Sequence, residues 1–191
     1  MTTTPTTLQM KVTLAGIRPP IWRRLVVSGE TTLAQLHVVL QVAMGWQDCH
    51  LHCFRIEGVR YGPADDGGFD LDDADESTVT VAEAFATGRR GVYEYDFGDS
   101  WEHELLIEKT DVPVVFSGVA TCTAGKRACP PEDCGGIWGY ANLLDALADP
   151  AHEEHEELLE WAGEDFDPEA FEPKAVNAHL ERLSFSRKKR K

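Results

Sequence analysis

The chain opens with two segments in which apolar and polar residues alternate, a pattern typical of half-buried β-strands. The first runs from Leu8 to Ala15, and the second, rich in β-branched and aromatic residues, runs from Ile21 to Ser28. Gly16 and the pair Pro19-Pro20 separate them. The pattern therefore predicts an antiparallel hairpin at the start of the fold.

The next segment changes to helical spacing. Apolar residues recur every three or four positions between Leu33 and Ala43. Thr31 or Thr32 can cap the start of a helix here, and Gly45 can end it. The pattern and its flanking residues therefore predict a helix.

The remaining elements follow in order. We expect a strand within 50–62 that turns back at Gly58, an exposed acidic loop over 65–76, a short helix opened by the Thr80–Glu83 capping box and ended by Gly88, and a second hairpin over 91–109. An irregular Gly-, Pro- and Cys-containing stretch then runs from Thr110 to Gly136, and short helices follow.

This order predicts an α+β fold. A mixed or antiparallel sheet built from β-hairpins, with a β-grasp-like start, is packed by helices, and the C-terminal part is helical. We expect a flexible leader at 1–7, a single domain at 8–183 and a basic tail at 184–191. Strands do not alternate with crossover helices and no G-x-G-x-x-G occurs, so a dinucleotide-binding fold is excluded.

Charge, apolar runs and cysteine number limit the classes of function that the chain can have. The chain has 191 residues, and its 33 acidic and 18 basic side chains give a net charge of −15. Such a polyanion repels nucleic acid, except through the basic tail. The sequence contains no apolar run long enough for a membrane span and no secretory signal. The five cysteines are an odd number, which favours free thiols or metal ligands in the cytoplasm over a disulfide framework.

Polar and aromatic residues concentrate in YDFGDSWEH, residues 95–103. This segment spans the turn of the second hairpin, and loops commonly hold functional groups. The candidate catalytic residues are Asp96, Asp99, His103 and Glu132, and the candidate ligand-binding residues are Tyr95, Trp101 and Asp133. For His103 the alternative is a buried structural histidine, because it shares one strand face with apolar side chains.

Histidines and cysteines form a second set of candidates. In a strand over Cys49–Cys53, His50 and His52 would face one side and the two cysteines the other, so all four cannot bind one ion. Three later thiols on a Gly/Pro-rich loop provide more ligands. The candidate metal ligands are His52, His103, Cys122, Cys129 and Cys134, for Zn²⁺ or another divalent metal. We expect His52 and His103 to share one neighbourhood, on adjacent or facing strands.

Several blocks together resemble a known family. They are IRPPIWRRLVV, HLHCFRI with Tyr61-Gly62, YDFGDSWEHEL, AGKRACPPEDCGGIWGY and a late DP-x-x-F element. On these residues the chain resembles the plasmid pRiA4b ORF-3-like family from Leu8 to Leu183. The resemblance implies a compact α+β domain often carried on plasmids and transposable elements, and it implies no particular reaction. Some relatives are likened to a resolvase, whose catalytic arginines and basic helix-turn-helix are not visible here.

Three functions remain as hypotheses. The first is a cytoplasmic binding or accessory module for a small molecule, a peptide or another protein. The second is a metal-dependent hydrolase or nuclease that uses His52, Asp96, Asp99, His103 and Glu132. The third is a DNA-associated factor of a mobile element, which binds through its basic tail. The composition favours the first, and whether the protein is an enzyme is left open.

Overall fold

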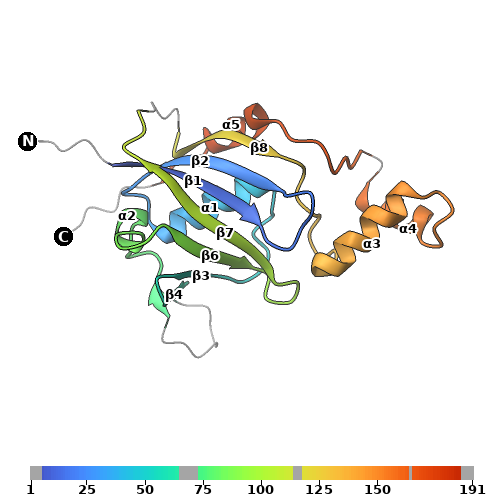
Figure 1. The fold of residues 1–191 in the computed structure, drawn as a ribbon, viewed down its shortest axis with the longest axis horizontal. Helices are drawn as coiled ribbons and strands as arrows, with labels where there is room; N and C mark the ends of the chain where they lie inside the picture. Colours follow the sequence, from blue (N-terminus) through green and yellow to red (C-terminus); the bar gives the residue numbers. More distant parts are fainter. Residues whose placement is uncertain (1–5, 65–72, 114–117, 164, 186–191) are drawn as a thin grey trace, which may run out of the picture.

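One eight-stranded mixed sheet forms the centre of the fold (Figure 1). The structure is a computed structural model, which describes residues 6–64, 73–113, 118–163 and 165–185. Within them the strands are β1 (Thr7–Leu14), β2 (Trp22–Ser28), β3 (His52–Ile56), β4 (Val59–Gly62), β5 (Ala74–Asp75), β6 (Arg90–Tyr95), β7 (Trp101–Thr110) and β8 (Ala120–Lys126). They lie in the order β5-β4-β3-β6-β7-β1-β2-β8, and the pairing of β4 with β5 is parallel.

Helices accompany the sheet. Across the described residues they are α1 (Leu33–Met44), α2 (Val81–Ala84), α3 (Gly136–Ala148), α4 (His155–Ala162) and α5 (Pro173–Leu180). In Figure 1, α1 lies across one face of the sheet, whereas α3 and α4 form an arm beyond one end of it. Separate helices on a largely antiparallel sheet make an α+β fold, and this confirms the fold class predicted from the sequence.

The first hairpin and α1 build much of the core. Met10 on β1 is opposite Leu25 on β2, and both side chains are buried. Helix α1 begins at the capping box of Thr32 and Gln35, and it ends at Gly45 in the left-handed conformation, with φ of 97°. These local signals fix the boundaries of α1, as predicted.

Three predicted boundaries are wrong. Part of the stretch expected to be irregular, Ala120–Lys126, forms β8, because it pairs with β2, a partner remote in sequence. Helix α2 is capped by Phe85 and ends before Gly88. Strand β3 begins at His52, so residues 49–51 belong to the loop before it. That last difference changes which way His50 points.

Helix α5 covers the outer side of β8 at Cys122. The side-chain amide of Asn177 donates to the Cys122 carbonyl at 2.9 Å, and its oxygen accepts the Cys122 N–H at 2.7 Å. The side chain of Asn177 thus takes the place of a neighbouring strand at this residue.

Parts of some predictions lie outside the described residues. These parts are residues 1–5 of the leader, 65–72 of the acidic loop and 186–191 of the basic tail. Thr7, the last residue of the predicted leader, already belongs to β1. Among the described helices, none is both long and apolar enough to span a membrane.

Candidate functional site

Three loops meet at one end of the sheet and bring four polar side chains together. His50 comes from the loop before β3, Asp96 from the turn between β6 and β7, and Glu132 and Asp133 from the loop before α3. The Nε2 atom of His50 lies 3.7 Å from Asp96 Oδ2, 3.8 Å from Glu132 Oε2 and 3.1 Å from Asp133 Oδ1. We call these four residues the His50 cluster.

Two atoms of the His50 cluster are buried without a hydrogen-bond partner in the described structure. They are Nε2 of His50 and Oε2 of Glu132. The Glu132 side chain is only 9% exposed, whereas that of Asp133 is 70% exposed. Leaving a buried polar atom unpaired costs about 1–3 kcal/mol, so two such atoms facing each other indicate a place for a further group.

The other oxygen of Glu132 is firmly held. Its Oε1 accepts the Gln47 backbone N–H at 2.7 Å and the Tyr95 hydroxyl at 3.1 Å. Burial raises the pKa of Tyr95, so the phenol stays protonated and donates. The same hydroxyl accepts the N–H of Cys49 at 3.0 Å. Tyr95, a predicted ligand-binding residue, therefore orients Glu132 toward His50.

Asp96 and Asp133 lie at sharp bends. Both have positive φ, at 56°, a conformation that aspartate adopts more readily than most residues. One carboxylate oxygen of Asp96 accepts the Gly98 N–H at 2.9 Å, and the other faces His50. The backbone of the turn thereby fixes the direction of the carboxylate.

Asp99 contacts the start of α3 rather than His50. Its carboxylate accepts the N–H of Gly135, the N-cap of α3, at 3.1 Å. A Cβ atom on Gly136 would lie 2.8 Å from the Asp99 carbonyl, so glycine permits this close approach. Asp99 therefore connects the hairpin turn to α3 and stands apart from the His50 cluster.

His52 on β3 and His103 on β7 share a neighbourhood, as expected, but β6 lies between the two strands, and the histidines do not share a site. Their rings lie 5.8 and 5.3 Å from that of Tyr93. His103 is 0% exposed, with one ring nitrogen 3.3 Å from the Tyr93 carbonyl and the other accepting the Trp46 indole N–H at 3.3 Å. Burial lowers the pKa of His103 to about 4. His103 is thus the buried structural histidine of the alternative interpretation.

His52 also has a partner of its own. Its Nε2 lies 3.0 Å from a carboxylate oxygen of Glu76, and both side chains are buried. Its ring stacks on that of His37, with centroids 3.5 Å apart. Trp101, expected to form the wall of a ligand site, is 1% exposed and packs beside Trp46. These side chains belong to the core.

The five predicted metal ligands are not brought together. Among the described residues, the groups of three or more ligand atoms within 4.8 Å of one another are Cys49–His50–Glu132 and His50–Asp96–Asp133. The later thiols Cys122, Cys129 and Cys134 are free and at least partly buried. Burial raises the pKa of Cys129 and of Cys134 to about 12, so both stay protonated near neutral pH.

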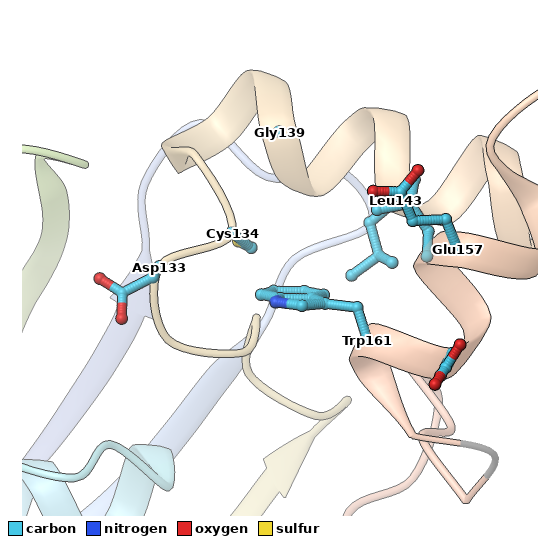
Figure 2. A pocket seen from close by; sticks show the side chains of 8 residues that line it. Asp133, Cys134, Gly139, Leu143, Glu157 and Trp161 are labelled. Carbon is cyan, nitrogen blue, oxygen red and sulfur yellow. The ribbon is translucent and has the colours of Figure 1, made fainter.

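A pocket of about 600 Å³ lies between the arm and the loop that contains Glu132. Its lining is Asp133, Cys134, Gly139, Leu143, Glu157, Leu158, Glu160 and Trp161 (Figure 2). Figure 2 shows the Asp133 carboxylate pointing away from the Trp161 ring, so one loop contributes to both the pocket and the His50 cluster. From 128 to 173 the sequence has 14 acidic residues and no lysine or arginine, which makes this part of the protein strongly negative.

The sequence pointed to Asp96, Glu132 and Asp133, but His50 and Cys49 were not among the predicted site residues. It treated residues 49–53 as one strand, in which alternation places His50 beside His52. The sequence does carry a signal that residues 46–50 form a loop. They follow the helix end at Gly45, and apolar and polar residues do not alternate among them. A loop here frees His50 to face the other two loops.

The fold and the His50 cluster define an α+β protein with histidine and carboxylates gathered where three loops meet. The chain belongs to the plasmid pRiA4b ORF-3-like protein family, whose profile matches residues 6–175. It is 41% identical over 179 residues to the uncharacterized protein y4hQ of Sinorhizobium fredii, covering 93% of this chain and 92% of the relative.

A solved structure supports the same assignment. It is a crystal structure of MM3350, a protein of unknown function from Methanosarcina mazei. The two chains are 37% identical with a TM-score of 0.80, and the match covers 90% of this chain and 98% of the other. These relatives confirm the family and the fold, and their names state no activity.

Proposed function

We propose that the protein is a binding module for a divalent transition-metal ion, held by the His50 cluster. The observation that carries this proposal is a pair of buried atoms without hydrogen-bond partners, His50 Nε2 and Glu132 Oε2, which lie 3.8 Å apart. An ion between them would satisfy both atoms. Imidazole and carboxylate are ligands that Zn²⁺, Fe²⁺ and Mn²⁺ accept.

The distances fit such an ion. Two ligand atoms each about 2.1 Å from a tetrahedral ion lie about 3.4 Å apart. The carboxylate oxygens of Asp96, Glu132 and Asp133 lie 3.7, 3.8 and 3.1 Å from His50 Nε2, which brackets that separation. The oxygens of Asp96 and Glu132 are too far from the ring nitrogen for a hydrogen bond, and that of Asp133 forms none. An ion between the ring nitrogen and these oxygens would therefore interrupt no hydrogen bond between them.

Charge supports a cation as the occupant. Three carboxylates converge on one imidazole, and within the described part of the chain their only ion-pair partner is His50. The net charge of −15 and the acidic arm repel phosphate-rich polymers. This supports a metal-binding module over a nuclease or a DNA-associated factor.

The test is calorimetric titration of metal-free, untagged protein with Zn²⁺ and Mn²⁺. We expect one ion per chain, and we expect His50→Gln to weaken binding by about tenfold or more. His179→Gln is the matched control, because His179 is exposed and, among the described residues, its side chain bonds only within α5. Failure of the wild type to bind, or unchanged binding by His50→Gln, would refute the proposal.

A metal-dependent hydrolase is the second candidate. The exposed Asp133 side chain, 70% accessible, supports it because an ion here has one side open to water. Metal-bound water is a strong nucleophile near neutral pH. Neutral or cationic esters and amides suit the negative surroundings better than phosphates. Hydrolysis of such substrates only with metal, and its loss in His50→Gln, would favour this role.

We also propose a cytoplasmic location. It is supported by the five free cysteines, which an oxidising compartment would tend to pair. Cell fractionation followed by thiol labelling tests it, and recovery of the protein with oxidised thiols from an exported fraction would contradict it.

A further inference from the structure

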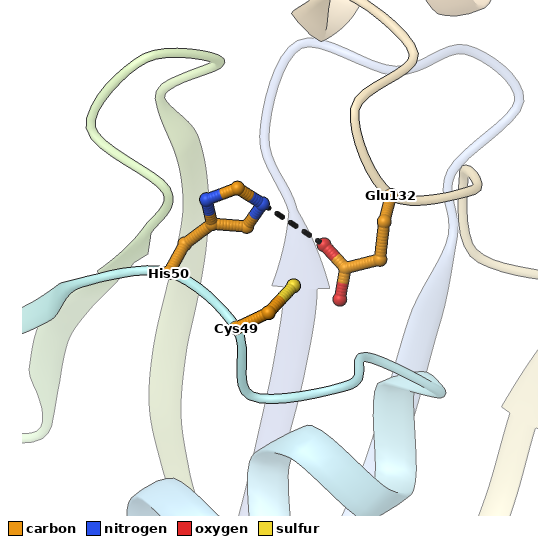
Figure 3. A group of neighbouring side chains, drawn as sticks. All are labelled: Cys49, His50 and Glu132. Carbon is orange, nitrogen blue, oxygen red and sulfur yellow. Dashed lines mark ion pairs between the residues drawn. The ribbon is translucent and has the colours of Figure 1, made fainter.

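Cys49 lies beside the proposed ion site and offers a different kind of ligand. Its Sγ, a ring nitrogen of His50 and a carboxylate oxygen of Glu132 all lie within 4.8 Å of one another. Figure 3 shows the three side chains converging from the loop before β3 and from the loop before α3. We propose that Cys49 binds the ion as a thiolate, so that the site takes Zn²⁺, Fe²⁺ or Co²⁺ and rejects Mg²⁺ and Ca²⁺. This inference rests on the proposed metal-binding function.

The position of Cys49 is built by its neighbours, although the residue itself is exposed. Asp48, immediately before it, has a φ of 56°, and its N–H donates to Gln41 Oε1 at 2.9 Å. The Asp48 carboxylate also lies 2.8 Å from His37 Nε2. Both contacts anchor the loop to α1, so the thiol is held where the chain turns toward His50.

Tyr95 links the thiol to the carboxylate. Its hydroxyl lies 3.7 Å from Cys49 Sγ and 3.1 Å from Glu132 Oε1, and it accepts the Cys49 N–H. One phenol therefore sets the separation of two proposed ligands. Groups that orient metal ligands in this way are a regular part of metal sites.

The unpaired oxygen of Glu132 points to the ion independently of the cysteine. This side chain is 9% exposed, and its Oε2 has no hydrogen-bond partner in the described structure. The Cys49 thiolate and the Glu132 carboxylate would each supply negative charge to a divalent ion, and the His50 imidazole would supply a nitrogen ligand. Sulfur and nitrogen ligands favour zinc-like ions, whereas Mg²⁺ and Ca²⁺ require oxygen.

The experiment loads the full-length, metal-free protein with Co²⁺ and records its absorption spectrum. We expect one Co²⁺ per chain and a near-ultraviolet band from charge transfer between thiolate and cobalt. Cys49→Ser should abolish that band. Cys53→Ala is the matched control and should keep it, because Cys53 is buried on β3 and its thiol faces Glu94. Zn²⁺ should remove the band by competition, and excess Mg²⁺ should not.

The outcomes separate the two proposals. Wild-type protein that binds no Co²⁺ overturns the metal-binding function itself. Bound Co²⁺ without the band, or with a band that persists in Cys49→Ser, overturns only the thiolate ligand. Should Cys49→Ser fail to fold, alkylation of the wild type with iodoacetamide decides the question. Zn²⁺ should protect Cys49, and equal labelling with and without Zn²⁺ overturns the inference.

Discussion

Protonation of His103 is expected to destabilise the fold in mild acid. The imidazole is 0% exposed, and burial lowers its pKa from 6.5 to about 4. Between these values the unfolded chain binds a proton that the folded protein does not, so the free energy of unfolding falls as pH falls from 6.5 toward 4. One pKa unit is worth about 1.4 kcal/mol, so this difference corresponds to about 3 kcal/mol.

Urea unfolding at a series of pH values between 7 and 4 measures this loss in the wild type and in His103→Gln. Glutamine does not titrate, so the wild type should lose about 3 kcal/mol more than the variant. Burial lowers the pKa of His37 as well, but this group contributes to both proteins and cancels in the difference. Equal losses in the two proteins would refute the reasoning. If His103→Gln does not fold, NMR of the wild type at pH 5 should find His103 neutral, and a protonated ring there would refute it too.

Three further outcomes are expected. Tyr95→Phe should weaken Zn²⁺ affinity by about 10–100-fold in calorimetry, because a ligand loses its orienting partner; unchanged affinity would contradict that role. Arg23→Met should lower the free energy of unfolding by about 2–4 kcal/mol, since Arg23 is 2% exposed and donates at 2.8 Å to the Ala43 carbonyl. An unchanged denaturant midpoint would count against this. Asp99→Ala should cost about 1 kcal/mol and speed hydrogen exchange at the Gly135 amide, whereas unchanged exchange would show that Asp99 does not secure α3.

Elements defined by neighbours in sequence could be predicted well. The capping box at Thr32 and the glycine at Gly45 bound α1, and Gly58 provides the turn between β3 and β4. Each of these signals acts within a few residues, so it can be recognised without the fold. Strand β8 escaped prediction because its alanines, Gly125 and Lys126 have low strand propensity, and pairing with β2 supplies the stabilisation.

The site was only partly predictable for a related reason. Asp96 could be identified because it lies in a tight turn rich in polar groups, and Glu132 because it lies in a loop that sequence alone marks as irregular. The partner of both is His50, more than eighty residues from Glu132, and no local pattern reports that contact. For His103 the sequence left two interpretations open. Strand alternation buries its ring against Tyr93 and Trp46, which fits the structural interpretation.

The contact between Asn177 and Cys122 has a consequence for association between copies of the chain. An edge strand whose backbone groups are free can recruit a strand from another molecule and begin aggregation. At Cys122 both backbone groups are already bound by one amide side chain from α5. At the opposite edge β5 is only two residues long and offers little length for pairing. The sheet thus ends on a helix at one margin and on a very short strand at the other, and growth by strand addition is discouraged at both.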